Sequence, residues 1–243
     1  MEEKNRQQIK RLEEIIAGSN NIVFFGGAGV STESGIPDFR SVDGLYHQKY
    51  DYPPETILSH TFYRYYTKEF YDFYKEKMIG FDAKPNKAHL KLAEWEKEGK
   101  LKAVITQNID GLHQMAGSQR VLELHGSVLR NYCEACGKSF GVEYIRQSSG
   151  VPVCDACGGC VKPDVVLYEE GLDQQLLEEA VSLIRNAEVL IIGGTSLVVY
   201  PAAGLIDYYR GDKLILINKD STDKDGIANL VVQGAIGEIF GAL

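Results

Sequence analysis

Short apolar runs alternate with helical patterns along most of this chain, and this alternation limits the fold more than any other feature. Four clear runs occupy residues 21–25, 101–106, 188–193 and 213–218, with weaker candidates at 165–168 and 230–232. Helical patterns occupy residues 7–17, 87–98, 174–186 and 201–210. Runs of this length and β-branched content are typical of buried parallel strands joined by helices. The sequence therefore predicts an α/β fold built on a parallel sheet.

All five cysteines lie between Cys133 and Cys160. Two Cys-x-x-Cys pairs, Cys133/Cys136 and Cys154/Cys157, are separated by seventeen residues, which is the spacing of a tetrahedral zinc site. Because four thiolates leave no coordination position for water, we predict one structural zinc ion. Cys160 could replace Cys157, since Cys157-x-x-Cys160 is also an allowed pair. We favour Cys157 because it keeps both pairs as Cys-x-x-Cys-Gly.

Two segments interrupt the alternation of strands and helices. Residues 41–83 are rich in tyrosine and phenylalanine and look helical, whereas residues 128–162 hold the cysteines and several glycines. We predict that both are insertions into one unit spanning residues 1–243. The parallel sheet then comprises residues 1–40, 84–127 and 163–243, with a helical module at 41–83 and a zinc ribbon at 128–162.

The net charge of −8 argues against a protein that binds the phosphate backbone of nucleic acid. The polar start of the chain lacks the apolar region of a signal peptide, and no stretch approaches eighteen consecutive apolar residues. We expect a cytoplasmic monomer that contacts neither nucleic acid nor membrane directly.

A glycine-rich turn, residues 26–31, follows the first apolar run. Such a turn lets backbone N–H groups approach a pyrophosphate, although an ordinary strand-to-helix turn is the alternative. The hydride-transfer fingerprint requires a glycine where this chain has Thr32. The next segment, 34–40, contains Gly35 and Pro37 and is predicted to fold over a ligand, with Phe39 and Arg40 facing it. We therefore predict a dinucleotide site without hydride-transfer geometry.

Polar side chains also follow three other predicted strands, at residues 106–110, 193–196 and Asn218. In open α/β sheets, ligands bind beyond the carboxyl ends of the strands. Asp110 could instead cap a helix. His125, beside Gly126 at the junction with the cysteine segment, is a candidate general base. His89 and His113 fall in helical patterns and are expected to be structural.

Taken in order, these motifs resemble those of the sirtuins, the NAD-dependent protein lysine deacylases, from about residue 21 to residue 240. The resemblance rests on the strings at 27–31, 35–40, 106–113, 125–126 and 194–196 and on the four cysteines. It implies a Rossmann-like large domain and a small domain formed by the helical module and the zinc ribbon. NAD would lie in the cleft between the domains, and an acyl-lysine peptide would enter as an added strand.

The resemblance also implies roles for individual residues. NAD is consumed: nicotinamide leaves, the acyl group passes to ADP-ribose, and His125 acts as general base on a ribose hydroxyl. Val165, Val166 and Tyr168 are expected to bind the peptide. The residues expected to bind NAD are Gly27, Ala28, Thr32, Asp38, Phe39, Arg40, Gln107, Asn108, Ile109, Asp110, Thr195, Ser196, Asn218 and Ala235.

Some positions depart from the family pattern. Tyr168-Glu169-Glu170 stands where the family often has Phe-Gly-Glu, and Gly234-Ala235 stands where it often has an acidic step. Family members that remove succinyl groups share a Tyr-x-x-Arg pair, but here Tyr71 is followed by Tyr74. Without that cation we predict neutral acyl substrates. The alternative functions are an NAD-dependent protein mono-ADP-ribosyltransferase and a non-enzymatic zinc-ribbon interaction module.

Overall fold

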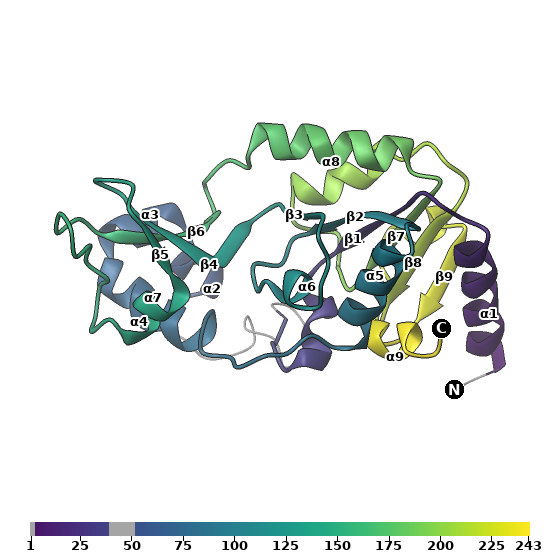
Figure 1. The fold of residues 1–243 in the computed structure, drawn as a ribbon, viewed down its shortest axis with the longest axis horizontal. Coiled ribbons are helices and arrows are strands. Elements are labelled where there is room, and N and C mark those ends of the chain that lie inside the picture. Colours follow the sequence, from purple (N-terminus) through teal and green to yellow (C-terminus); the bar gives the residue numbers. More distant parts are fainter. Residues whose placement is uncertain (1–2, 39–51) are drawn as a thin grey trace.

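The computed structural model describes residues 3–38 and 52–243. A large part contains a six-stranded parallel sheet, and a small part contains a three-stranded antiparallel sheet with short helices (Figure 1). The large sheet has the strand order β3-β2-β1-β7-β8-β9. Its strands are β1 (Ile22–Gly26), β2 (Leu101–Thr106), β3 (Val121–Glu123), β7 (Val189–Gly193), β8 (Leu214–Asn218) and β9 (Leu230–Gln233). This sheet confirms the predicted fold class.

The parallel strands are buried on both faces because side chains alternate between two apolar cores. In β1, Ile22 and Phe24 lie in one core, which also holds side chains of α1 (Glu3–Ala17), α5 (Lys87–Lys97) and α9 (Ile236–Phe240). Val23 and Phe25 point into the other core, beneath α8 (Gln174–Asn186) and the 3-10 helix η4 (Ala202–Tyr208). Helices therefore cover both faces of the sheet (Figure 1).

The small part joins two segments that are distant in sequence. The helices α2 (Pro54–Ile57), α3 (His60–Tyr65) and α4 (Thr67–Lys77) precede the sheet β5-β4-β6, and α7 (Val142–Gln147) follows β5. The strands are β4 (Gly126–Cys133), β5 (Ser139–Gly141) and β6 (Val161–Val165). Aromatic residues of α3 and α4 share one core with apolar residues of β4 and β6. The two insertions thus fold against each other.

The remaining elements are short. The glycine-rich turn contains the 3-10 helix η1 (Ala28–Val30), and a second 3-10 helix, η2 (Thr32–Ser34), follows it. The helix α6 (Leu112–Met115) follows β2, and η5 (Asp225–Ile227) precedes β9. Among residues 3–38 and 52–243, no helix is long and apolar enough to cross a bilayer.

Several expected elements differ from those observed. The helical pattern expected at 201–210 is the shorter 3-10 helix η4 (Ala202–Tyr208), with Pro201 as its N-cap residue. The apolar run 165–168 contributes only Val165 to a strand, because β6 lies earlier and pairs with β4 in the small sheet. That sheet begins at Gly126 and ends at Val165, beyond the residues 128–162 expected for the cysteine module.

Candidate active site and metal centre

The glycine turn after β1 packs directly on the turn after β7. The two strands are paired up to Gly26 and Gly193, and the Gly29 amide donates to the Gly194 carbonyl at 2.8 Å. A Cβ atom on Gly27 would lie 2.8 Å from the Thr195 Cβ atom, and one on Gly29 would lie 2.8 Å from the Gly194 Cα atom. These glycines are therefore required for turn-to-turn packing as well as for any approach of a pyrophosphate.

A buried polar network links the glycine turn to the end of β2. The Ser31 hydroxyl donates to Asp110 Oδ2 at 2.6 Å and accepts from Asn108 Nδ2 at 3.1 Å. Asp110 Oδ1 also accepts from the Leu112 amide at 2.9 Å, so Asp110 supports the start of α6 as the alternative interpretation expected. Burial raises the pKa of Asp110, and the bonds from Ser31 and Leu112 oppose that rise.

The polar turns after β2, β7 and β8 form one connected chain. Gln107 Nε2 donates to the Thr195 hydroxyl at 3.0 Å. The Thr195 amide donates to Asn218 Oδ1 at 3.0 Å, and Asn218 Nδ2 donates back to the Thr195 carbonyl at 3.1 Å. Three strand ends that were predicted separately therefore meet at one edge of the sheet.

His125 lies between the small sheet and the polar edge, the name used here for the connected residues Gln107, Thr195 and Asn218 at the strand ends. Its Nδ1 atom is 2.9 Å from the Gln107 carbonyl oxygen, which can only accept, so Nδ1 carries the proton and Nε2 is the basic nitrogen. Burial lowers the pKa of His125, while the bond to Gln107 opposes this. The ring is therefore neutral near pH 7, the state that a general base requires.

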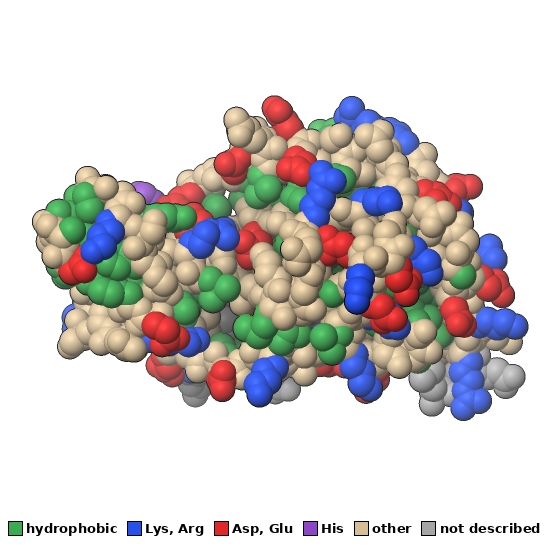
Figure 2. Space-filling view, viewed as in Figure 1, with side chains coloured by type: hydrophobic (Ala, Val, Ile, Leu, Met, Phe, Trp, Pro, Cys, Tyr) green, Lys and Arg blue, Asp and Glu red, His purple; other side chains and the backbone are tan. Residues whose placement is uncertain are grey.

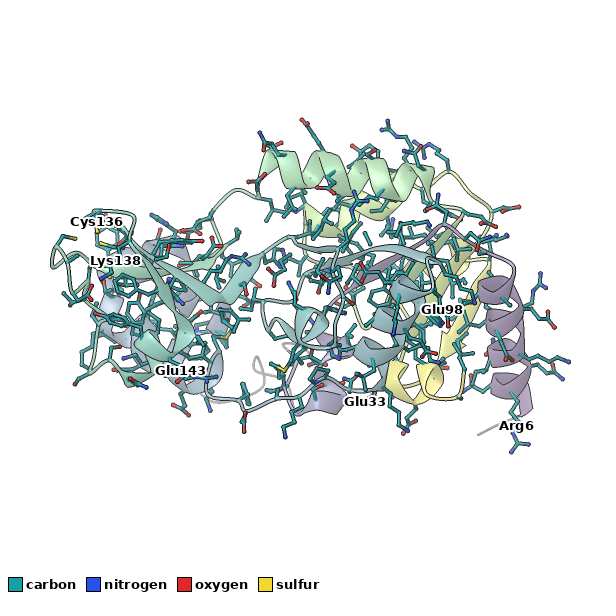
Figure 3. The ribbon with its side chains drawn as sticks, in the orientation of Figure 1. Arg6, Glu33, Glu98, Cys136, Lys138 and Glu143 are labelled. Atoms are coloured by element: carbon teal, nitrogen blue, oxygen red, sulfur yellow. The ribbon has the colours of Figure 1, made fainter. Side chains whose placement is uncertain are left out.

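Two residues that the sequence did not single out hold the glycine turn in place. Asn86, the N-cap residue of α5, donates through Nδ2 to the Val30 carbonyl at 2.7 Å. Glu33 Oε2 accepts from the Gly237 amide at 2.6 Å and so ties the turn to α9 (Figure 3). Asn86 carried a detectable signal as a helix cap, whereas Glu33 carried none. The network also includes Ser31, which the motif contained but the list of expected NAD contacts omitted.

Other residues expected to bind NAD lie around the glycine turn or at the sheet edge. Thr32 donates through its hydroxyl to the Gly29 carbonyl at 3.1 Å, and Asp38 follows η2. Ser196 is exposed after β7, and Ala235 is the N-cap residue of α9. Phe39 and Arg40 lie outside the described residues.

The segment expected to bind peptide connects His125 to the helical module. Val165 pairs with Gly126, and the Val166 amide donates to the His125 carbonyl at 2.9 Å. The Tyr168 amide donates to the Leu58 carbonyl at 3.0 Å, and the Tyr168 carbonyl accepts from the His60 amide at 2.9 Å. Both backbone groups of Tyr168 are thus already used within the protein, where they join the segment after β6 to the start of α3.

Four cysteine sulfurs gather at the far end of the small part, where Figure 3 labels Cys136. The sulfurs of Cys133, Cys136, Cys154 and Cys157 all lie within 4.8 Å of one another. The Cys133–Cys157 and Cys136–Cys154 distances are 3.4 and 3.7 Å. Tetrahedral Zn–S bonds of about 2.3 Å place sulfurs about 3.8 Å apart, so the cluster fits a zinc ion.

Cys160 lies outside this cluster. Its sulfur is 3.3 Å from the Tyr63 hydroxyl, which also donates to Glu134 at 2.8 Å. The group of four contains Cys157, the residue that the repeated Cys-x-x-Cys-Gly pattern favoured.

His89 of α5 and His113 of α6 form a buried pair. The His89 and His113 rings are 4.7 Å apart between α5 and α6, and both side chains are almost fully buried. Neither ring nitrogen of His113 has a hydrogen-bond partner among the described residues. Burial lowers the pKa of His89 to about 4 and that of His113 to about 3, so both are neutral near pH 7, in the structural role that we expected.

This pair predicts a loss of stability in weak acid. Unfolded histidines keep a pKa near 6.5 and bind protons below that pH, whereas the folded His113 stays neutral until its own lower pKa is reached. Between pH 7.5 and 5.0, His113 alone should lower the free energy of unfolding by about 2 kcal/mol. Urea unfolding at the two pH values measures this, with His113→Leu as the comparison. An equal pH dependence in the variant would contradict the assignment.

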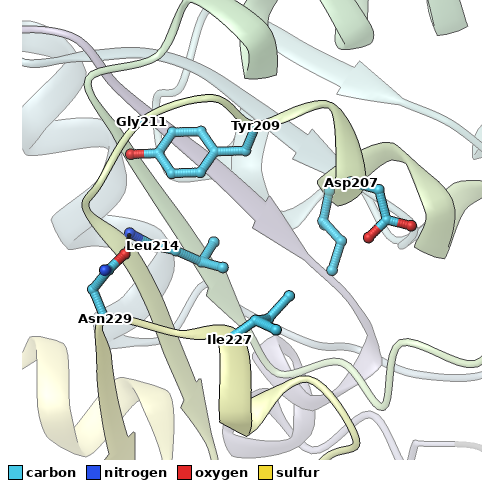
Figure 4. Close-up of a pocket in the computed structure, with 7 residues that line it drawn as sticks. Asp207, Tyr209, Gly211, Leu214, Ile227 and Asn229 are labelled. Carbon is cyan, nitrogen blue, oxygen red and sulfur yellow. Dashed lines mark hydrogen bonds between the residues drawn. The ribbon is translucent and has the colours of Figure 1, made fainter.

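A separate pocket of about 320 Å³ lies near η4, between Asp207, Tyr209 and Asn229 (Figure 4). None of its lining residues belongs to the polar sheet edge or the cysteine cluster.

Comparison with known proteins places this arrangement in a family. Residues 27–201 match the Sir2 family. An NAD-dependent protein deacetylase of Clostridium acetobutylicum is 61% identical over 236 residues, which cover 96% of both chains. One of Clostridium perfringens is 60% identical over 237 residues, covering 96% of this chain and 97% of the relative. A solved structure described as Sir2 with p53 peptide and NAD+ is 42% identical, covers 96% of both chains and has a TM-score of 0.86. This chain belongs to the Sir2 family, which confirms the resemblance found in the motifs.

Proposed function

We propose that this protein is an NAD-dependent protein deacetylase, which transfers the acetyl group of acetyl-lysine to ADP-ribose and releases nicotinamide. One observation carries the proposal. His125 has a basic Nε2 atom, and its Nδ1 atom donates a hydrogen bond to the Gln107 carbonyl, beside the residues expected to bind NAD. Its backbone carbonyl accepts a hydrogen bond from the amide of Val166, in the segment expected to bind the peptide. A single residue thus connects the two predicted substrate sites. The close relatives named NAD-dependent protein deacetylase support the same activity.

The polar edge provides the groups that would bind NAD. Asn108, Ile109 and Asp110 would hold the nicotinamide end, with Ser31 fixing the two polar side chains. Gln107 would contact the nearby ribose, and Thr195, Ser196 and Asn218 the adenosine side. The glycine turn, from Gly27 and Ala28 to Thr32, would face the phosphates, and Asp38, Phe39, Arg40 and Ala235 would complete the site. Bound NAD supplies a ribose carbon that becomes electrophilic as nicotinamide leaves.

The role proposed for His125 follows from its tautomer. Nδ1 is held by the Gln107 carbonyl, so Nε2 can accept a proton from a ribose hydroxyl and activate that oxygen for attack on the acyl carbon. Holding the imidazole in one tautomer by a backbone carbonyl removes the need to reorient the ring during the reaction.

Tyr71 and Tyr74, which stand where the succinyl-removing members have Tyr-x-x-Arg, predict the acyl preference because neither provides a cation. Tyr71 and Tyr74 are fully buried, and the Tyr71 hydroxyl donates to the Val161 carbonyl at 2.5 Å. The nearby Lys75 ammonium is held by the carbonyls of Ser148 and Gly150. Because an unpaired carboxylate is costly to bury, we expect kcat/KM for acetyl-lysine to exceed that for succinyl-lysine by roughly tenfold or more. Steady-state kinetics on a matched peptide pair measures the ratio, and faster desuccinylation would contradict this prediction.

The activity itself is tested by mass spectrometry of an acetyl-lysine peptide incubated with the protein and NAD. We expect loss of 42 mass units (about one acetyl group) from the peptide, together with free nicotinamide and acetylated ADP-ribose, only when NAD is present. A gain of an ADP-ribose unit on a peptide or on the protein, without deacetylation, would favour the mono-ADP-ribosyltransferase alternative and overturn the proposal.

The proposal includes the partners and the setting of the protein. The substrates are acetylated lysine-containing proteins, and Val165, Val166 and Tyr168 form the peptide-binding segment. Residues 41–83 and 128–162 act as modules inserted into one catalytic unit of 243 residues that works as a cytoplasmic monomer. Lysine, arginine and acidic side chains are intermixed on the face shown in Figure 2, which supports the expectation that nucleic acid is not a direct partner.

A further inference from the structure

Glu169 has a backbone conformation that favours glycine. Its φ angle is +77°, in the left-handed region that L-residues rarely adopt. It occupies the position at which the family pattern often has the glycine of Phe-Gly-Glu. A residue with a side chain persists in such a conformation only when surrounding contacts hold it there.

The carboxylate of Glu169 makes those contacts. Its Oε2 atom accepts from the Thr61 amide at 2.8 Å and from the Thr61 hydroxyl at 2.7 Å. These bonds lower the pKa of Glu169, so the acceptor stays charged at neutral pH. Thr61 belongs to α3 and precedes Glu169 by 108 residues in the sequence. A glycine at 169 would relieve the backbone but would lose both bonds.

The same connection extends to the neighbouring residues. Tyr168 forms a parallel bridge with Ser59, closed by backbone bonds to Leu58 and His60. Glu170 accepts from the Leu167 amide at 2.9 Å and lies 2.8 Å from His60 Nδ1. The hydrogen bonds between Glu169 and Thr61 are one residue further along both chain segments than the backbone hydrogen bond between Tyr168 and His60, and they continue the connection to α3.

We propose that Glu169 is a positioning residue for the acyl-peptide. Residues 166–168 are fixed at one end by the bond from Val166 to His125, and the Glu169–Thr61 contact fixes the other end to the helical module. This segment is therefore held at a set distance from the catalytic histidine before a peptide binds, which lowers the ordering cost of adding a strand. The inference rests on the proposed function, because it assigns the peptide to this segment.

Kinetics on three variants separate positioning from backbone strain. Glu169→Gly and Glu169→Ala both remove the carboxylate, but only alanine keeps the strained φ angle. We expect both to raise KM for the acetyl-peptide three- to tenfold, with KM for NAD and kcat within about twofold of wild type. Glu169→Gln keeps an oxygen acceptor for Thr61 and should restore a KM near the wild-type value. Alanine should also lower the melting temperature more than glycine does.

Hydrogen exchange supplies a readout that does not depend on activity. Exchange at the Thr61 amide should be faster in Glu169→Gly than in the wild type, and slow again in Glu169→Gln. An unchanged Thr61 exchange rate in the glycine variant would show that the contact does not order α3. Faster exchange with an unchanged peptide KM would show that it orders α3 but does not position the peptide. Either result overturns the inference.

The failure of the proposed function would look different. If the wild-type protein showed no NAD-dependent deacetylation, the proposed function would fail. The positioning role would fail with it, while Thr61 exchange would still report whether the contact exists. A Thr61→Val and Thr61→Ser pair tests the partner side: valine loses the hydroxyl bond and should raise peptide KM, whereas serine keeps it and should not.

Discussion

Replacing His125 by alanine should abolish deacetylation and leave the fold intact. The methyl group cannot accept a proton from a ribose hydroxyl, and a positioned general base contributes about 10²–10⁴-fold to such steps. The side chain is half-buried and, among the described residues, is hydrogen-bonded only to the Gln107 carbonyl at the sheet edge, so the packing cost should be small. Single-turnover release of deacetylated peptide at saturating NAD measures the loss.

The pH dependence of the wild-type protein gives a second measure of the same role. Burial lowers the pKa of His125, so the ring keeps its neutral, basic form in more acidic solution than a free imidazole does. We expect kcat to be level near neutral pH and to fall in acid, with the fall at a lower pH than the pKa of about 6.5 of a free imidazole would give. A His125→Ala protein that keeps near-normal turnover, with an unchanged melting temperature, would refute the general-base assignment.

Replacing Cys133 by serine should cost the protein its zinc ion and much of its stability. Cys133 is buried in the core that the two modules share, so loss of the metal would release both β4 and the adjoining helices. Structural zinc sites contribute directly to folding, and we expect the zinc content to fall from one ion per chain to near zero. Metal analysis together with a melting curve measures both effects.

Cys160→Ser is the matched control for this substitution. Cys160 lies three residues after Cys157 but contacts Tyr63 and stands outside the four-sulfur cluster. We expect this variant to keep one zinc ion and to lose little stability. If Cys160→Ser lost zinc while Cys157→Ser kept it, the ligand assignment would be wrong.

The elements that the sequence predicted best are those with a strong local pattern. The strand Leu101–Thr106 and the helix Gln174–Asn186 have the expected bounds, because a short buried run and an amphipathic stretch with an Asp173 cap are local signals. The strands β3 and β5 were not predicted. Each has three residues, and their pairing partners rather than their own composition make them strands.

The site residues also divide into those with a local sequence signal and those that depend on partners distant in the sequence. The polar turns after β2, β7 and β8 were found because strand ends in a parallel sheet meet at one edge. Glu33 was missed because its partner, Gly237, lies 204 residues away and neither residue belongs to a motif. The departure at Glu169 was visible in the sequence, but the compensating bonds to Thr61 depend on how α3 packs.

The interlocked turns after β1 and β7 constrain any attempt to change the cofactor. Gly27, Gly29 and Gly194 approach so closely that a side chain on one would displace the other turn. Substituting Thr32 by glycine would complete only the three-glycine part of the hydride-transfer fingerprint, and the turn would still be shaped by its neighbour after β7. An engineer who wants a different nucleotide at this edge would have to transplant both turns together.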